Sequence, residues 1–148
     1  MINEFKGKYY FLSNFYPSSI TPWADNITYP TVEHAFQAMK SLDINERKNI
    51  AQLPTPGDAK YAGRRVKLRP DWNNVKIDIM RQALEAKFKN SELRELLLNT
   101  DDEILIEGNN WSDNFWGDCY CSRCRNIKGQ NHLGRLLMEI REELKKEN

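Results

Sequence analysis

Residues 29–37 read Tyr-Pro-Thr-Val-Glu-His-Ala-Phe-Gln and predict the start of a helix. Thr31 can cap its first turn, and Pro30 stands immediately before this cap. Apolar residues then recur at the spacing of one helical face: Val32, Ala35, Phe36 and Met39. Glu33 and Gln37 share a neighbouring edge of the same helix. The stretch therefore predicts an amphipathic helix that carries a carboxylate and an amide side by side.

Further helices are predicted on similar grounds. Thr55-Pro56 opens one of them, with proline at its first position, and Gly63 is its predicted end. Three more helices are marked by apolar residues at helical spacing: Ile77, Met80, Leu84 and Phe88; Leu93, Leu96 and Leu97 behind a Ser91 cap; and Leu133, Leu136, Leu137, Ile140 and Leu144.

Strands are predicted at few places. The aromatic run from Tyr9 to Tyr16 could begin as a strand, and the run from Glu103 to Glu107 has the pattern of a short strand. There is no internal repeat or interdomain linker, and Pro54 to Gly57 is a turn between short helices. The predicted fold class is α+β, a mainly helical single domain over residues 1–148 with a small β-sheet.

Composition narrows the class of protein. The chain has 148 residues, 40% apolar and 29% charged, which suits one globular domain. Its net charge of +1 gives no general footprint for long nucleic acid, although local positive charge could hold a small anion. The first residues lack the apolar core of a signal peptide, and no apolar run approaches the length of a membrane span. We therefore expect a cytoplasmic protein with no membrane partner.

Several polar residues lie outside the packing pattern. Asn14 stands in an aromatic run, where it is either a turn amide or a group that faces a ligand. Glu33 could serve only the helix dipole, and Lys60 and Arg64 could belong to a solvated basic face. The two basic residues nevertheless lie one turn apart near Gly63, an arrangement suited to a phosphate.

The stretch Asp113-Asn-Phe-Trp-Gly117 interleaves acidic and amide groups with aromatic rings. Its rings could simply fill a core. The same combination is what a site needs to stack a base and hold a ribose.

Taken in order, these segments resemble the NADAR family, whose YbiA-like members are N-glycosidases. The matching segments are Phe11-Leu-Ser-Asn-Phe-Tyr-Pro17; Tyr29 to Gln37; Ala59-Lys60 with Gly63-Arg64; Leu68-Arg69-x-Asp71-Trp72; Asp113-x-Phe-Trp-Gly117; and Gly129-x-Asn131-x-Leu-Gly-x-Leu-Leu-Met138. They span essentially the whole chain, so the resemblance favours the functional interpretation of the polar residues.

The resemblance implies hydrolysis of the bond between ribose C1 and a base, with no cofactor and no metal. One family branch acts on ribosylamino-pyrimidine 5′-phosphates of riboflavin synthesis, and another removes ADP-ribose from modified guanine in nucleic acid. The expected partner is therefore a small nucleotide or an ADP-ribosylated guanine. The expected catalytic residues are Glu33, Lys60 and Asp113, and the expected substrate-binding residues are Asn14, Phe15, Tyr29, Gln37, Arg64, Trp116 and Asn131.

Two of these roles have alternatives. Glu33 is the expected acid/base, whereas Lys60 either acts electrostatically on phosphate or sugar, or attacks a ring-opened C1 as an amine. A non-catalytic module that senses ADP-ribose or NAD is the alternative class of protein. Such a module would have no use for Glu33 or Lys60, so we rank it second.

The three cysteines of the chain stand close together, as Cys119-x-Cys121-x-x-Cys124. With His132 as a fourth ligand they could form a structural zinc site, with no open position for water. The favoured interpretation is three reduced thiols that pack a loop. A zinc-stabilised nucleic-acid-binding domain is disfavoured by the near-neutral charge.

Overall fold

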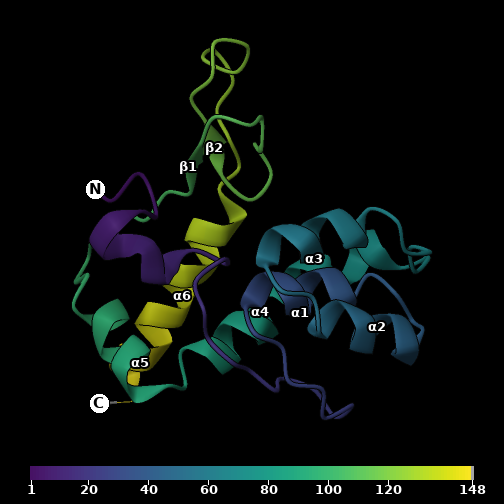
Figure 1. The fold of residues 1–148 in the computed structure, drawn as a ribbon. Helices are drawn as coiled ribbons and strands as arrows, with labels where there is room; N and C mark the ends of the chain where they lie inside the picture. The colour runs from purple at the N-terminus through teal and green to yellow at the C-terminus, as the bar shows by residue number, and fades with distance from the viewer. Residues whose placement is uncertain (148) are drawn as a thin grey trace. The chain divides into compact units, whose positions relative to one another are not determined.

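The computed structural model describes residues 1–147, which divide into two compact units. One unit joins residues 1–13 to the chain from Asn90 onward, and the other comprises Asn14–Lys89. Figure 1 traces the chain through its helices and strands. The mainly helical α+β class with a small sheet is confirmed. One domain over residues 1–148 stays a prediction, and the last residue of that range lies outside the described part.

The unit Asn14–Lys89 is built around one short helix. α1 (Val32–Ala38) contacts α2 (Ile44–Ala51), α3 (Pro56–Gly63) and α4 (Trp72–Lys87). Every residue of α1 is buried. Phe36 of α1 packs on Trp72 of α4 with ring centroids 5.0 Å apart. Polar side chains on α1 are consequently held in the interior of this unit.

The predicted starts of α1 and α3 are confirmed. Thr31 Oγ1 accepts a hydrogen bond from His34 N at 3.1 Å, and Thr55 Oγ1 accepts one from Asp58 N at 3.0 Å. α3 begins at Pro56, whose missing N–H is not needed in a first turn, and ends at Gly63 as expected.

Replacing Thr55 with alanine is expected to lower the free energy of unfolding by about 1 kcal/mol, because the first turn of α3 loses its side-chain acceptor. Urea unfolding of the full chain measures the change. Thr55→Ser keeps the hydroxyl and is the matched control. Equal losses in the two variants would contradict the capping role.

The other unit combines helices with the small sheet. It contains the 3₁₀ helix η1 (Gly7–Leu12), α5 (Ser91–Leu98) and α6 (His132–Lys146). β1 (Gly108–Asn109) pairs in parallel with β2 (Asp118–Cys119), and the chain then loops out before α6 begins (Figure 1). Four of the five apolar residues predicted for the buried face of α6 are buried: Leu133, Leu136, Leu137 and Ile140. The fifth, Leu144, is half-buried, and Gly134 and Arg141 are buried as well.

Both predicted strands are wrong. The run from Tyr9 to Tyr16 begins inside η1, because its backbone makes short-range bonds such as Tyr9 N to Lys6 O at 3.0 Å. The run from Glu103 to Glu107 makes only one isolated bridge, between Leu105 and Ile2. In the run from Glu103 to Glu107, the alternating pattern therefore corresponds to the burial of Leu105 and not to a strand paired along its length.

The predicted cap of α5 is also wrong by one position. Asn90, not Ser91, precedes the helix, and its side chain accepts a hydrogen bond from Leu93 N at 3.1 Å. Both residue types cap helices well, so the sequence could not choose between neighbours.

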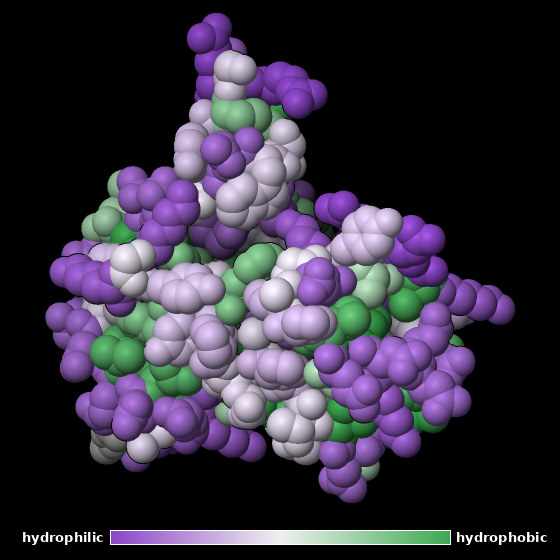
Figure 2. Space-filling view, in the orientation of Figure 1, coloured by the Kyte–Doolittle hydropathy of each residue, from purple (hydrophilic) through white to green (hydrophobic). Residues whose placement is uncertain are grey.

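Among the described residues, no helix is long and apolar enough to cross a membrane. On the face drawn in Figure 2, hydrophobic residues form separate areas among hydrophilic and intermediate ones.

Candidate functional site

A buried carboxylate lies in the interior of the Asn14–Lys89 unit. Glu33 is only 7% exposed, and its Oε1 accepts a hydrogen bond from Gln37 Nε2 at 2.8 Å. The backbone N–H of Glu33 donates to the carbonyl oxygen of Asn14 at 3.1 Å. The structure thus brings together Asn14, Glu33 and Gln37, and we name these three residues the Glu33 cluster.

Two amide oxygens of the Glu33 cluster have no hydrogen-bond partner within the described part of the chain. They are Asn14 Oδ1 and Gln37 Oε1, both buried. The amide nitrogen of Asn14 donates only to Met80 Sδ, a weak acceptor, at 3.5 Å. Buried polar atoms are rarely left unsatisfied, so each such atom calls for an explanation. A ligand that carries hydroxyl groups would provide the missing donors.

Gly63 makes room for the Gln37 side chain. A Cβ added to Gly63 would lie 1.9 Å from Gln37 Oε1 and 2.8 Å from its Cδ. Any larger residue at this position would therefore displace Gln37 from its place beside Glu33. The glycine thus serves this packing, and the approach of a phosphate near its backbone stays a prediction.

Several charged groups act on Lys40, which follows α1 by two residues. Burial lowers the pKa of Lys40 below its ordinary value, and the charge of Glu33 opposes this shift. The positive charges of Arg64, Lys60 and Lys76 lower the pKa of Lys40 further. Lys60 is half-buried and Arg64 is exposed. Lys60 and Arg64, the predicted basic pair, therefore act electrostatically on the same ammonium group as Glu33.

Sequence reasoning missed Lys40. It follows Gln37 by three positions and Glu33 by seven, which is the spacing of one helical face. The spacing that places Lys40 on this face is therefore visible in the sequence. The ammonium nitrogen of Lys40 lies 5.9 Å from the ring centroid of Trp72, within the range of a cation–π contact. Trp72 in turn contacts α1 through Phe36, so the side chain of Lys40 is held next to the helix of Glu33.

The predicted aromatic contacts of this unit differ in exposure. Phe15 is half-buried, whereas Tyr29 is fully buried and meets the Trp23 ring edge-on at 5.9 Å. Burial, and then the nearby carboxylate of Asp25, raises the pKa of the Tyr29 hydroxyl. Substrate contacts of Phe15 and Tyr29 stay predictions.

His34 is a buried core imidazole. Its Nδ1 lies 2.8 Å from Thr31 Oγ1, and its Nε2 lies 2.9 Å from the carbonyl oxygen of Leu53. The ring joins the start of α1 to the segment before α3. Burial lowers its pKa below the ordinary value of 6.5.

This shift predicts a pH dependence of stability. Because the folded pKa of His34 lies below 6.5, the unfolded chain binds more protons in the window below that value. The free energy of unfolding should be highest above about pH 6.5 and should decline as the pH falls through the lowered folded pKa. Urea unfolding across this window measures the decline. In His34→Gln the contribution should vanish, and an unchanged pH profile in that variant would contradict the assignment.

Asp113 shapes its own turn in the other unit. Its Oδ1 accepts hydrogen bonds from Phe115 N at 3.1 Å and Trp116 N at 2.9 Å. The half-buried ring of Trp116 meets the Phe115 ring edge-on at 4.8 Å. The acidic-aromatic stretch is therefore a compact turn that fixes the direction of Trp116.

Asn131 links two segments of the same unit. Its Oδ1 accepts a hydrogen bond from Glu107 N at 3.0 Å, and its Nδ2 donates to Leu105 O at 2.9 Å. It adopts a left-handed backbone conformation, with φ of 52°, immediately before α6. Its side chain is thus engaged with backbone. The substrate contacts predicted for Asp113, Trp116 and Asn131 are not tested by this arrangement.

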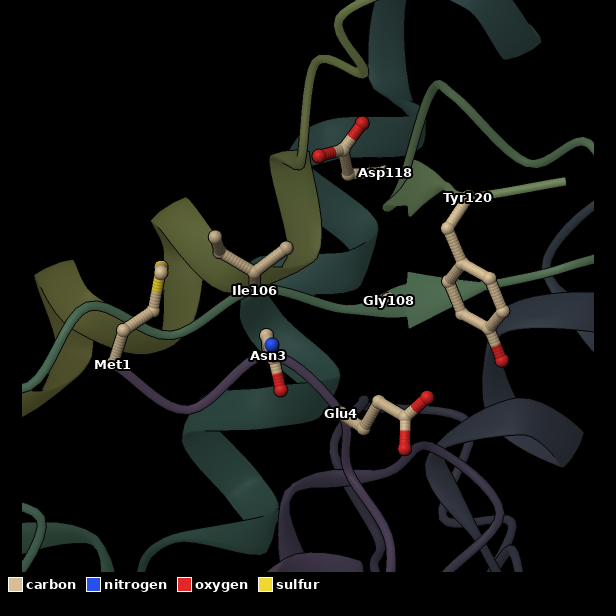
Figure 3. A pocket seen from close by; sticks show the side chains of 7 residues that line it. All are labelled: Met1, Asn3, Glu4, Ile106, Gly108, Asp118 and Tyr120. Carbon is tan, nitrogen blue, oxygen red and sulfur yellow. The ribbon is translucent and has the colours of Figure 1, made fainter. Parts of the chain in front are cut away.

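A pocket of about 410 Å³ opens beside the sheet of this unit. Figure 3 shows Met1 at one end of it and Tyr120 at the other, with the carboxylates of Glu4 and Asp118 between. The full lining is Met1, Asn3, Glu4, Ile106, Gly108, Asp118 and Tyr120. None of the predicted site residues belongs to this lining, so the pocket adds nothing to the predicted site.

Comparison with known proteins identifies the class. The profile of the NADAR domain family matches residues 2–145, so the chain belongs to the NADAR family and the resemblance seen in the sequence is confirmed. The chain is 45% identical over 133 residues to the N-glycosidase YbiA of Shigella boydii serotype 4 (strain Sb227), a match that covers 86% of this chain and 79% of that protein.

Two further similarities extend this result. The chain is 37% identical over 148 residues to the chloroplastic riboflavin biosynthesis protein PYRR of Zea mays, covering 89% of this chain but 23% of that protein. The NMR structure of the E. coli protein YbiA matches with a TM-score of 0.80 at 40% identity, covering 99% of this chain and 88% of that one. The fold expected from the family is therefore confirmed.

Proposed function

We propose that the protein is a hydrolase that cleaves the N-glycosidic bond of a small phosphorylated ribosylamine, specifically a ribosylamino-pyrimidine 5′-phosphate. The reaction class is that named for the YbiA relative, and the substrate class follows the riboflavin pathway named for the maize relative. We expect it to act in the cytoplasm. The observation that carries the proposal is the buried carboxylate of Glu33, which pairs with Gln37 and acts on the same lysine, Lys40, as the positive charges of Lys60 and Arg64.

Glu33 supplies the acid/base chemistry. When the bond between C1 and nitrogen breaks, positive charge develops at C1 and the departing base needs a proton. Glu33 assists the addition of water to C1 and the transfer of a proton to the leaving nitrogen. Asn14 Oδ1 and Gln37 Oε1 accept hydrogen bonds from the ribose hydroxyls, which satisfies the two unpartnered oxygens of the Glu33 cluster.

The basic residues hold the phosphate. Arg64 offers a planar fork of donors, and Lys60 and Lys40 supply further positive charge. Lys60 acts electrostatically in this account, and borohydride trapping during turnover would reveal an adduct if it formed a Schiff base instead. Asp113 is the remaining proposed catalytic residue, and the remaining proposed substrate contacts are Phe15, Tyr29, Trp116 and Asn131.

Product analysis tests the function. The protein is incubated with a ribosylamino-pyrimidine 5′-phosphate and, separately, with DNA that carries ADP-ribosylated guanine. Free base is expected from the first substrate. Release of ADP-ribose from the second alone would transfer the assignment to the guanine branch. Release from neither substrate would contradict the hydrolase and favour the ADP-ribose sensor.

The phosphate site makes a separate prediction. Arg64→Gln is expected to lower kcat/KM for the phosphorylated substrate by about tenfold or more, because a charge-assisted bond worth roughly 1.5–3 kcal/mol is lost. The variant should lose little on the dephosphorylated substrate. Arg65→Gln is the matched control, because the neighbouring guanidinium of Arg65 donates to the Tyr61 hydroxyl at 2.8 Å. Equal effects of Arg64→Gln on both substrates would exclude a phosphate contact.

A further inference from the structure

The cysteines of the unit that contains the sheet are grouped around one point. The Sγ atoms of Cys119, Cys121 and Cys124 all lie within 4.8 Å of one another, and all three thiols are free. Thiolates on one tetrahedral zinc ion, each about 2.3 Å from the metal, lie about 3.8 Å apart. Small side-chain adjustments would therefore bring all three sulfurs onto one ion.

The backbone holds this group in place. Ser112 N and Cys121 N donate hydrogen bonds to Cys119 Sγ at 3.2 Å and 3.4 Å. Cys124 N donates to the carbonyl oxygen of Cys121 at 3.0 Å and closes the turn between them. Hydrogen bonds to sulfur stabilise a thiolate and orient it as a ligand.

Local charge also suits an anionic cluster. Arg123, Arg125 and Lys128 lie in the same loop, and all three are exposed. Three thiolates and one divalent ion leave one net negative charge, which these basic residues would offset. The chain supplies this compensation within a few residues of the ligands, although its overall charge is only +1.

The fourth ligand considered from the sequence is not in the group. The Nε2 of His132 lies 2.9 Å from Gln130 Oε1, and its ring packs against Phe115 with centroids 4.5 Å apart. Within residues 1–147, no histidine or carboxylate joins the three thiols. The hydroxyl oxygen of Ser112 lies 3.8 Å from Cys121 Sγ. A Cys3His set is therefore wrong for this loop, and a bound ion would keep one position for solvent or a hydroxyl.

We propose that Cys119, Cys121 and Cys124 bind one thiophilic d¹⁰ metal ion, with Zn²⁺ the expected ion and Cu⁺ the alternative. Binding forms three metal–sulfur bonds and releases three thiol protons to solvent. The ion would tie β2 to the loop that follows it. The proposal does not depend on the N-glycosidase assignment.

Direct metal analysis tests this proposal on the untagged full chain under reducing conditions. Elemental analysis and titration with Zn²⁺ or Cu⁺, each against a competing chelator, should give one ion per chain. Cobalt substitution should produce thiolate-to-metal charge-transfer absorption. Cys124→Ser should lose tight binding, whereas Ser122→Ala, in the same loop, should keep it. Tighter retention of Cu⁺ than of Zn²⁺ would identify copper as the ion.

Alkylation of the wild-type protein keeps the test independent of how well the serine variant folds. Bound metal should protect all three thiols from alkylation, and a chelator should expose them. Three outcomes would overturn the proposal: no stoichiometric binding of either metal, unchanged binding in a folded Cys124→Ser protein, or a disulfide within the cluster under reducing conditions. The metal-free protein is expected to stay active. A failed metal-binding experiment would therefore not affect the N-glycosidase assignment, and a failed activity assay would not affect the metal site.

Discussion

Replacing Glu33 with glutamine is expected to lower kcat by about 100- to 10,000-fold, the usual contribution of a positioned acid/base. Glutamine keeps the size of the side chain and can still bond to Gln37, so the fold of α1 should survive. What it loses is the ability to take up and release a proton beside C1. Steady-state assays of base release from a ribosylamino-pyrimidine phosphate measure the effect.

The matched control for this substitution is Glu46→Gln. Glu46 also accepts a side-chain hydrogen bond, from Ser41 Oγ, but its carboxylate has no part in the proposed chemistry. This control should keep nearly full turnover. Substrate affinity of Glu33→Gln should remain close to that of the wild type, because the loss is confined to the transition state.

Replacing Gly63 with alanine is expected to disturb the same site by displacing Gln37. The added methyl group would lie 1.9 Å from Gln37 Oε1, so the Gln37 side chain must leave its position beside Glu33. We expect turnover to fall by about tenfold or more, as for a misplaced catalytic group. The free energy of unfolding should fall by about 1–3 kcal/mol from overpacking.

A second glycine of the same helix provides the control for Gly63→Ala. A Cβ added to Gly57 meets only Thr55 Oγ1, at an ordinary contact distance of 3.7 Å. Gly57→Ala should therefore preserve turnover and slightly raise stability, because alanine favours the helix. If Gly63→Ala and Gly57→Ala behaved alike, Gly63 would not be the support of Gln37.

Local signals in the sequence predict the starts of α1 and α3 correctly, whereas α2 and η1 are not predicted. The starts of α1 and α3 depend on Thr31, Thr55 and Pro56, which act on neighbouring backbone groups. The strands were predicted wrongly because pairing depends on distant segments. Leu105 meets Ile2 across more than one hundred residues, and no pattern within the run from Glu103 to Glu107 encodes that partner.

The candidate site likewise combines contacts that a local pattern predicts with contacts that depend on distant segments. Glu33 and Gln37 were paired correctly from their spacing, because one helix sets their contact. Lys40 was missed because its significance depends on Lys60 and Arg64, which reach it from another part of the unit. The engagement of both polar atoms of the Asn131 side chain with backbone could likewise not be read from the sequence.

The cysteines illustrate a different limit. Their spacing allowed both a packed loop and a metal site, and the sequence alone favoured the packed loop. The distance between the three sulfurs and the N–H donors to Cys119 depend on the turn geometry of the loop. These are tertiary properties, and they favour the metal site over the packed loop.

The proposed mechanism requires Glu33 to act as the acid/base of an N-glycosidase site. A single-turnover experiment with enzyme in excess over a ribosylamino-pyrimidine 5′-phosphate tests it most directly, since it separates bond cleavage from binding and product release. We expect wild-type protein to release the base rapidly, and Glu33→Gln to bind the substrate with similar affinity but to release base at least about 100-fold more slowly. Cleavage by Glu33→Gln at the wild-type rate would exclude Glu33 as the acid/base.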